Sequence, residues 1–213
     1  RASYRGHRHE FTVPAPLAEA LRSAAREQGL TLFMLLLAGF EVLLQRYSGE
    51  EKVLFGATVS GRPAALPGVE QMVGLFINTV PVAVEMDGDA PLADWLRQLQ
   101  QRQAEAQEYS YLTLPEIQRW SSIPSGTPFF ESLLVFENYP VDSTVLEQGQ
   151  DLLKGVSSHE QTNYPLTVAS VPQRKAGGSG LHFDISYDMR RFDGGSIVRM
   201  MGHLETLLGG MAE

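Results

Sequence analysis

The sequence predicts an α/β fold in which a mixed β-sheet is flanked by helices. Segments with the two-residue alternation of strands interleave with segments that have the apolar period of helices, and they follow no regular repeat. Glycines and prolines separate these segments. Of the 213 residues, 43% are hydrophobic and 20% are charged, which is typical of a globular protein and not of a disordered one.

The beginning of the chain predicts one strand and two helices. Residues 7–13 alternate weakly, as in a strand, and two prolines then open a helix that ends at Gly29. Thr31 is placed to cap a second helix that runs to about Tyr47. Because the first three turns of this helix are apolar all round, we expect it to be the central buried helix.

Two strands follow, separated by a loop rich in glycine and proline. Residues 52–60 predict a strand that is buried on both faces. The next strand has one apolar face, which carries Val80, Val82, Val84 and Met86. Polar or small residues occupy the alternate positions, so we expect this strand to have one buried and one exposed face.

The middle of the chain predicts two helices and one strand. A long amphipathic helix begins at Pro91; its apolar stripe contains Leu92, Trp95, Leu96 and Leu99. We expect the far side of this helix, within residues 97–108, to be a solvated face of charges and amides. Residues 113–120 predict a short helix, and residues 131–140 predict a strand.

The end of the chain predicts a hairpin and a closing helix. Residues 165–171 and 181–187 alternate as strands around a glycine-rich turn. Asp193 is placed to cap the helix. We expect its apolar side to carry Ile197, Met200, Met201, Leu204, Leu207 and Leu208.

The composition argues against several classes of function. A formal charge of −8 argues against a nucleic-acid partner. The chain has no cysteine, which excludes disulfides and thiol catalysis and fits a cytoplasmic location. The longest apolar run is about 15 residues, below the ~20 of a membrane helix, so we expect no membrane partner. Arg1 is not an initiator methionine, and we expect a fragment of a longer chain.

The histidines give neither a catalytic constellation nor a metal site. His7 and His9 share one face of a strand, but no third ligand stands at a matching spacing, so two exposed histidines are the better interpretation. We expect His182 to belong to a polar cross-strand row, and His203 to be partly buried and hydrogen-bonded. Residues 177–180 are rich in glycine but lie in a hairpin turn. The residues alone indicate no catalytic group in this chain.

The most unusual stretch is residues 73–84. Gly74 precedes an apolar triplet, and Asn78 with Thr79 places an amide and a hydroxyl at the entrance of a strand. A glycine and two small polar side chains at this place suggest close approach of the backbone to another group. The alternative is a bulge with local capping.

Five segments, taken in order, resemble the second half of a condensation domain of nonribosomal peptide synthetases. They are residues 31–62, 73–84, 128–140, 163–171 and 185–208. The resemblance runs from about Tyr4 to the end of the chain. Its most specific part is a Gly-x-Phe-x-Asn-Thr element, formed here by Gly74, Phe76, Asn78 and Thr79.

Two departures from the family pattern bear on function. Many members carry a His-Gln-Asp-x-Pro-Phe-Glu segment, whereas residues 109–116 here keep only a Pro-x-Glu. The catalytic His-His-x-x-x-Asp-Gly motif of the family is absent, and in the family it belongs to the first half. The resemblance therefore implies that residues 1–213 are the carboxy-terminal lobe of a chloramphenicol acetyltransferase-like fold, inactive without the amino-terminal lobe.

The resemblance also implies partners and a site. In the family, two lobes enclose a tunnel, and donor and acceptor peptidyl carrier proteins bring their substrates into it on phosphopantetheine arms. No cofactor would bind this chain directly. The tunnel wall would include Gly74, Phe76, Asn78 and Thr79, and Asn78 would orient the substrate or the tetrahedral intermediate. A segment between Asn138 and Asn163 would cross to the other lobe.

The segment Ser60, Gly61 and Arg62 also matches the family. Arg62 would meet a carboxylate of the partner lobe, or it would form a surface ion pair of little energetic value. We expect the isolated lobe to self-associate weakly, because it would expose the face that its partner covers.

Two other functions are compatible with these residues. One is a carrier- or partner-binding module without catalysis, and the other is a self-sufficient acyltransferase of the same superfamily. The lack of an evident histidine base counts against the second. Epimerisation and heterocyclisation domains share the fold, but the Phe-x-Asn-Thr element fits condensation better than epimerisation.

Overall fold

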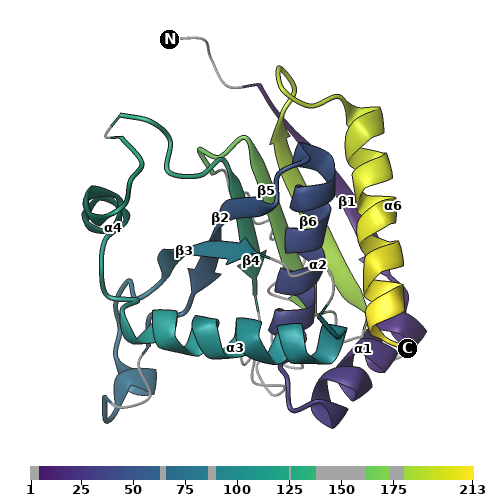
Figure 1. The fold of residues 1–213 in the computed structure, drawn as a ribbon, viewed down its shortest axis with the longest axis horizontal. Coiled ribbons are helices and arrows are strands. Elements are labelled where there is room, and N and C mark those ends of the chain that lie inside the picture. The colour runs from purple at the N-terminus through teal and green to yellow at the C-terminus, as the bar shows by residue number, and fades with distance from the viewer. Residues whose placement is uncertain (1–4, 63–65, 86–89, 125, 138–161, 173–179) are drawn as a thin grey trace, which may run out of the picture.

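The structure is a computed structural model, and it describes residues 5–62, 66–85, 90–124, 126–137, 162–172 and 180–213. A six-stranded mixed sheet forms its centre, as the sequence predicts (Figure 1). The strands are β1 (Gly6–Val13), β2 (Lys52–Val59), β3 (Asn78–Glu85), β4 (Ser132–Phe136), β5 (Leu166–Pro172) and β6 (Leu181–Asp188). Their order is β1-β6-β5-β4-β2-β3. β4 is parallel to β2 and β5, and the other pairs are antiparallel.

The described helices are α1 (Ala15–Glu27), α2 (Leu32–Ser48), α3 (Leu92–Glu108), α4 (Leu114–Trp120) and α6 (Gly194–Met211), with a 3₁₀ turn, η1, at Val69–Gln71. α1, α2, α3 and α6 pack on the sheet or on one another (Figure 1). α2 contacts α1, α3 and α6 as well as β2 and β4. α4 contacts β3 and projects from the body of the molecule (Figure 1).

The central helix, α2, begins and ends where its caps predict. The Thr31 hydroxyl accepts a hydrogen bond from the backbone N–H of Met34 at 3.3 Å, and Gly49 ends the helix with a φ of 74°. Ten consecutive residues, 34–43, are buried. Phe40 meets Phe55 of β2 edge to face, with ring centroids 5.2 Å apart. The predicted central buried helix is therefore confirmed.

Both strands that flank the glycine- and proline-rich loop are confirmed. In β3, Val80, Val82 and Val84 are buried, while their alternating neighbours are partly or fully exposed. In β2, Phe55 is fully buried on one face, and the opposite face at Gly56 is covered by the ring of Phe130. A Cβ at Gly56 would lie 2.4 Å from that ring, so this position requires glycine.

The other helices and the hairpin also form as predicted, with one error in α3. Trp95, Leu96 and Leu99 are buried, but Leu92 is 42% exposed. Leu92 opens the first turn of the helix and lies outside the stripe that faces the core. In α6, Asp193 Oδ1 accepts a hydrogen bond from the N–H of Ser196 at 2.9 Å, and the side chains at 197, 200, 201, 204 and 208 are buried. β5 and β6 pair antiparallel; their connection, like residues 86–89 and the predicted crossover segment within 138–161, lies outside the described residues.

Described histidines take structural positions. His7 is exposed and packs edge-on to Tyr187, and the ring of His182 is 3.2 Å from the hydroxyl oxygen of Thr12 in the predicted cross-strand row. His203 is hydrogen-bonded to Tyr47 at 3.0 Å, as expected, but it is exposed, so its predicted partial burial is wrong. Within the described residues, no group of three acidic, histidine or cysteine side chains could hold a metal ion.

No single described helix is long and apolar enough to cross a membrane. α1 and α2 pass that test only as a pair, and they bend by 107° where they meet.

Candidate functional site

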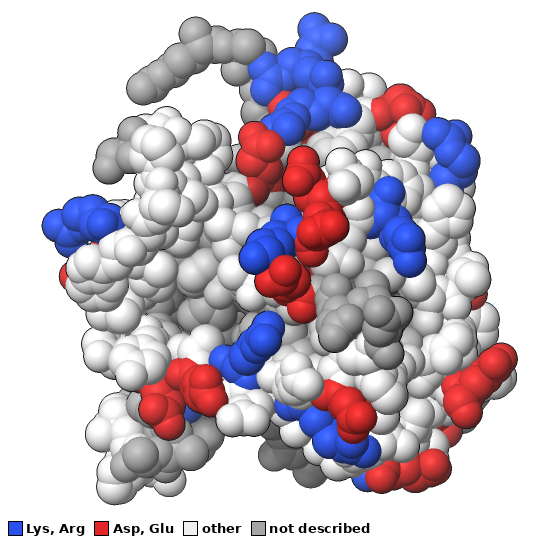
Figure 2. Space-filling model, viewed as in Figure 1, with Lys and Arg blue, Asp and Glu red and all other residues white. Residues whose placement is uncertain are grey.

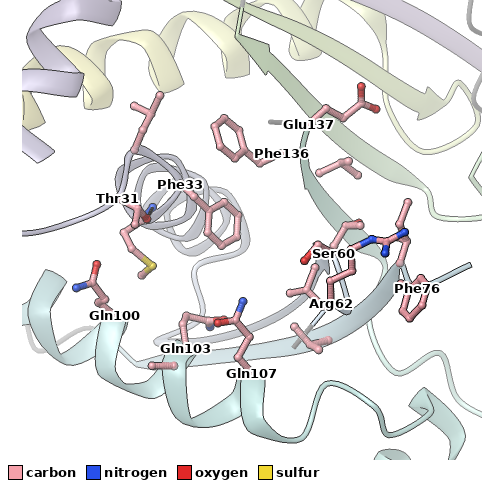
Figure 3. A pocket seen from close by; sticks show the side chains of 18 of the residues that line it. Thr31, Phe33, Ser60, Arg62, Phe76, Gln100, Gln103, Gln107, Phe136 and Glu137 are labelled. Atoms are coloured by element: carbon pink, nitrogen blue, oxygen red, sulfur yellow. Dashed lines mark hydrogen bonds between the residues drawn. The ribbon is translucent and has the colours of Figure 1, made fainter. Parts of the chain in front are cut away.

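A cavity of about 1250 Å³ opens at one end of the sheet (Figure 3). β2 and β4 run parallel, and the final residues of both strands line the cavity. The remaining walls come from the start of α2, from one face of α3 and from residues 74–77. Ligands of open α/β sheets bind outside the carboxyl ends of parallel strands, so this cavity is the candidate site.

Aromatic and amide side chains form opposite walls of this cavity. Phe33, at the start of α2, and Phe136, at the end of β4, are stacked with ring centroids 5.9 Å apart. Gln100, Gln103 and Gln107 line the α3 wall (Figure 3). The α3 face that the sequence predicts to be solvated therefore contributes three of its amides to the site, because α3 lies across the end of the sheet.

The Ser60-Gly61-Arg62 segment is packed against the 72–76 segment. Gly61 has a φ of 63°, and a Cβ there would lie 1.7 Å from the carbonyl oxygen of Phe76. Two backbones meet at this point, and only glycine leaves room for the contact. The close backbone approach predicted near Gly74 is thus centred on Gly61. A Cβ at Gly74 would meet the Phe76 ring at 3.2 Å.

Arg62 connects the end of the 60–62 segment to residues 69–76. Its Nη1 donates hydrogen bonds to the carbonyl oxygens of Val69 and Met72, the latter at 3.1 Å. Its guanidinium lies 4.2 Å from the centroid of the Phe76 ring, a cation–π contact. Among the residues that the structure describes, Arg62 contacts carbonyl oxygens and an aromatic ring and makes no ion pair.

Asn78 connects β3 to the chain between α3 and α4. Its Nδ2 donates to the carbonyl oxygens of Ser110 at 2.6 Å and Leu112 at 2.9 Å. Its Oδ1 accepts from the backbone N–H of Thr79 at 2.9 Å. Only the bond to Thr79 is local; both amide hydrogens are used in bonds to carbonyl oxygens 32 and 34 positions along the chain.

The structure gathers some of the sequence-predicted site residues and separates others. Ser60, Arg62, Gly74 and Phe76 line the cavity. Three others do not line the cavity: Gly61, Asn78 and Thr79. Gly61 and Asn78 contact the backbone of neighbouring segments instead. Sequence reasoning missed Phe33, Phe136, Gln103 and Gln107. The available signal was the spacing of glutamines at 100, 103 and 107, which places them on one face of a helix.

Several apolar side chains at and beside the cavity are exposed to solvent. Val73 and Leu75 are almost completely exposed, and Met72 and Ile77 are more than 40% exposed. Tyr111, just before α4, and Trp120, the last residue of α4, are more than 70% exposed. The left-hand part of Figure 2, where α4 projects in Figure 1, is mostly uncharged. Such a surface is typical of one that another structure covers.

Two ionisable groups outside the cavity have shifted pKa values. Glu41 of α2 is fully buried, and burial raises the pKa of its carboxyl to about 8 although Arg102 acts in the opposite direction. Asp188 lies at the end of β6, away from the cavity, and accepts three hydrogen bonds from the Arg190 guanidinium, which hold its pKa well below the usual range. No histidine is among the described residues that line the cavity.

Comparisons with known proteins agree with this architecture. The family model of the condensation domain matches residues 1–213. The chain is 42% identical to one of the linear gramicidin synthase proteins of Brevibacillus parabrevis over 204 residues, which are 96% of this chain and 4% of that protein. It is 34% identical to surfactin synthase subunit 2 of Bacillus subtilis (strain 168), over 96% of this chain and 6% of that protein.

Solved structures share the fold. A holo four-domain nonribosomal peptide synthetase, bound to AMP and glycine, matches with a TM-score of 0.80 at 19% identity, over 98% of this chain and 17% of that chain. The first condensation domain of the CDA synthetase matches with a TM-score of 0.74 at 18% identity, over 100% of this chain and 46% of that chain. The mixed sheet, its helices and the family match lead to one conclusion: this chain belongs to the condensation-domain family.

Proposed function

We propose that residues 1–213 form the carboxy-terminal lobe of a condensation domain of a nonribosomal peptide synthetase. The observation that carries this proposal is that the family model matches the whole chain, while the chain spans only 46% of a solved condensation domain. The amino-terminal lobe would supply the other half of the site. The cytoplasmic location expected from the sequence is part of the same proposal.

The proposed reaction joins two substrates that carrier proteins deliver on phosphopantetheine arms. The amine of an acceptor aminoacyl thioester attacks the carbonyl carbon of a donor acyl or peptidyl thioester. A C–N bond forms, the C–S bond breaks, the amine loses a proton and the departing thiolate gains one. The cavity of this chain has no histidine among its described residues, which supports placing the base in the amino-terminal lobe.

The residues of this chain would shape and line the tunnel. Gly74 and Phe76 line the cavity, and Arg62 holds Phe76 in place. The substrate-orienting role of Asn78 remains a proposal, and its two hydrogen bonds to residues 110 and 112 favour a structural role beside it. Thr79 would contribute through its position next to Asn78.

The exposed apolar side chains support the proposed partner lobe. Val73 and Leu75 present their whole side chains to solvent, yet their backbone is held by Gly61 and Arg62. Holding an apolar side chain outward is unfavourable unless another apolar surface covers it. We therefore place the amino-terminal lobe against residues 72–77.

An amide-forming assay tests this function. Donor- and acceptor-loaded carrier proteins are mixed with this chain alone, and again with the preceding segment of its parent protein. We expect product only when both parts are present. Product from this chain alone would contradict the proposal, because the base would then lie here. No product with both parts would favour the alternative of a binding module without catalysis.

A further inference from the structure

We propose that Gln103 and Gln107 bind the backbone amides of an extended peptidyl chain whose apolar side groups contact Phe33 and Phe136. This inference rests on the proposed function, because it names the class of donor that the cavity accepts: a peptidyl chain of several residues. The four side chains face the same cavity from opposite walls (Figure 3).

Two glutamines in the cavity have free hydrogen-bonding capacity. Gln100 is already engaged, since its Nε2 donates to the carbonyl oxygen of Gly29 at 3.1 Å, and its Oε1 is closed off from solvent. Gln103 and Gln107 line the cavity, are at least partly exposed and make no side-chain hydrogen bond within the described residues. Each offers one acceptor and two donors, the set that a peptide group complements.

Spacing matches this pair to a peptide backbone. Gln103 and Gln107 are four residues apart on α3, which corresponds to about 6 Å along the helix axis. In an extended chain, peptide groups that face the same side recur every two residues, or about 6.7 Å. Flexible glutamine side chains cover the small difference, so the two amides can contact alternate residues of one extended chain.

The cavity wall opposite the glutamines is apolar. Phe33 and Phe136 form a stacked pair, and the apolar ends of β2 and β4 continue the wall beside it. Alternate side groups of an extended chain point to opposite sides, so a chain with its amides on α3 can turn apolar groups toward these rings. A volume of about 1250 Å³ exceeds the roughly 300–1,000 Å³ of sites for drug-sized ligands, which leaves room for several residues.

Charged and neutral side chains line different parts of the cavity. Its charged lining residues are Arg22, Arg62 and Glu137. The guanidinium of Arg62 contacts two backbone carbonyls and the ring of Phe76, and Arg22 forms an ion pair with Glu19. Gln103 and Gln107 are neutral, and so are the two rings opposite, so the groups that we assign to the peptide offer hydrogen bonds and apolar contact.

Calorimetric titration of the intact condensation domain tests the inference directly. The probe is the peptide acetyl-Ala-Leu-Ala-Leu-methylamide, and the variants are Gln103→Ala, Gln107→Ala and their combination. We expect the double variant to weaken binding at least tenfold, because the hydrogen bonds of both glutamines to the peptide are lost. Gln101→Ala is the matched control: Gln101 lies on the same helix, is exposed and bonds to Glu105, so its loss should change the Kd less than twofold.

A second probe leaves the protein unchanged. Replacing one central amide of the peptide by an ester removes an N–H donor, and we expect binding to weaken several-fold in the wild type. This penalty should disappear in the glutamine variant that lost the matching acceptor. Unchanged affinity of the double variant, or failure of the peptide to bind at all, would overturn the inference.

Pantetheine provides the competing test, because its arm also contains secondary amides. Displacement of the peptide by pantetheine at lower concentration than by unlabelled peptide would assign the glutamines to the arm and overturn the peptidyl assignment. The titration needs no catalysis. A domain that binds the peptide through Gln103 and Gln107 but forms no amide would leave this inference standing and contradict the proposed function.

Discussion

Helix α2 and residues 72–78 are held in place by opposite means. Residues 34–43 of α2 are buried, so apolar contact fixes this helix from all sides. Among residues 72–78, Val73 and Leu75 are almost completely exposed, and the backbone is fixed by the Gly61 contact, by Arg62 and by Asn78. The first region is stabilised by what it buries, and the second by polar contacts behind an exposed apolar surface.

Under the proposed function, this difference would keep the exposed apolar surface in place before an amino-terminal lobe covers it. An exposed apolar loop without internal contacts would lose backbone order or collapse onto the core. Hydrogen bonds to carbonyl groups and a glycine contact keep this one extended at the cavity rim. Breaking them should affect the site more than the core, and the following substitutions test that.

The largest effect is expected from Gly61→Ala. A methyl group 1.7 Å from the Phe76 carbonyl oxygen cannot be accommodated, and the φ of 63° adds about 1–2 kcal/mol for a non-glycine residue. We expect residues 72–77 to detach from the 60–62 segment and condensation by the intact domain to fall at least tenfold. Gly68→Ala is the control, since its φ is 76° but nothing lies within 4 Å. Equal losses from both variants would show that the backbone contact does not matter.

The next effect concerns the core region and depends on pH. Burial raises the pKa of Glu41 to about 8, whereas the unfolded chain loses this proton near 4.5. Ionisation therefore favours the unfolded state, and the stability of the wild type falls between about pH 4.5 and pH 8. Glu41→Gln should abolish this part of the slope and gain about 2–4 kcal/mol in free energy of unfolding by pH 8.

Denaturant titrations at several pH values measure this gain. Glu50→Gln, at an exposed position just after α2, is the control and should show no such divergence. A difference between Glu41→Gln and the wild type that stays constant from pH 5 to pH 8 would contradict the buried, protonated state of Glu41.

Asn78→Ala should destabilise the lobe by about 1–3 kcal/mol, because the carbonyl groups of Ser110 and Leu112 lose their donor. Urea denaturation of the lobe and the condensation rate of the intact domain separate two roles. If both the condensation rate and the free energy of unfolding fall, the role of Asn78 is structural. A loss of rate with stability unchanged would instead support direct orientation of the substrate.

The smallest effect on stability is expected for Val73→Ser with Leu75→Ser. Both side chains are exposed, so the free energy of unfolding of this chain should change by less than about 0.5 kcal/mol. Sedimentation should show weak self-association of the wild type at high concentration and less of it in the variant. Binding to the amino-terminal lobe should weaken as well. A monomeric wild type at every concentration would count against a covered surface.

Sequence patterns predicted the regular elements well, because these patterns are local. The caps at Thr31 and Asp193 and the alternation of β3 depend on neighbours within a few residues. The family element at residues 74–79 also located the rim of the cavity. The contacts of the side chains in this element were not predictable from the sequence. Nothing in it shows that the amide group of Asn78 donates to carbonyl oxygens more than 30 residues away.

The sequence by itself determined the α/β class, the buried central helix and the family, because periodicity, capping and motif spacing are properties of short segments. Only the tertiary structure decided that Gly61 supports Phe76, that α3 turns Gln103 and Gln107 into the cavity, and that Val73 and Leu75 face outward. These outcomes depend on how distant segments pack against each other. A hydrophobic pattern indicates that a residue can be buried. Whether it is buried depends on how the rest of the chain packs around it.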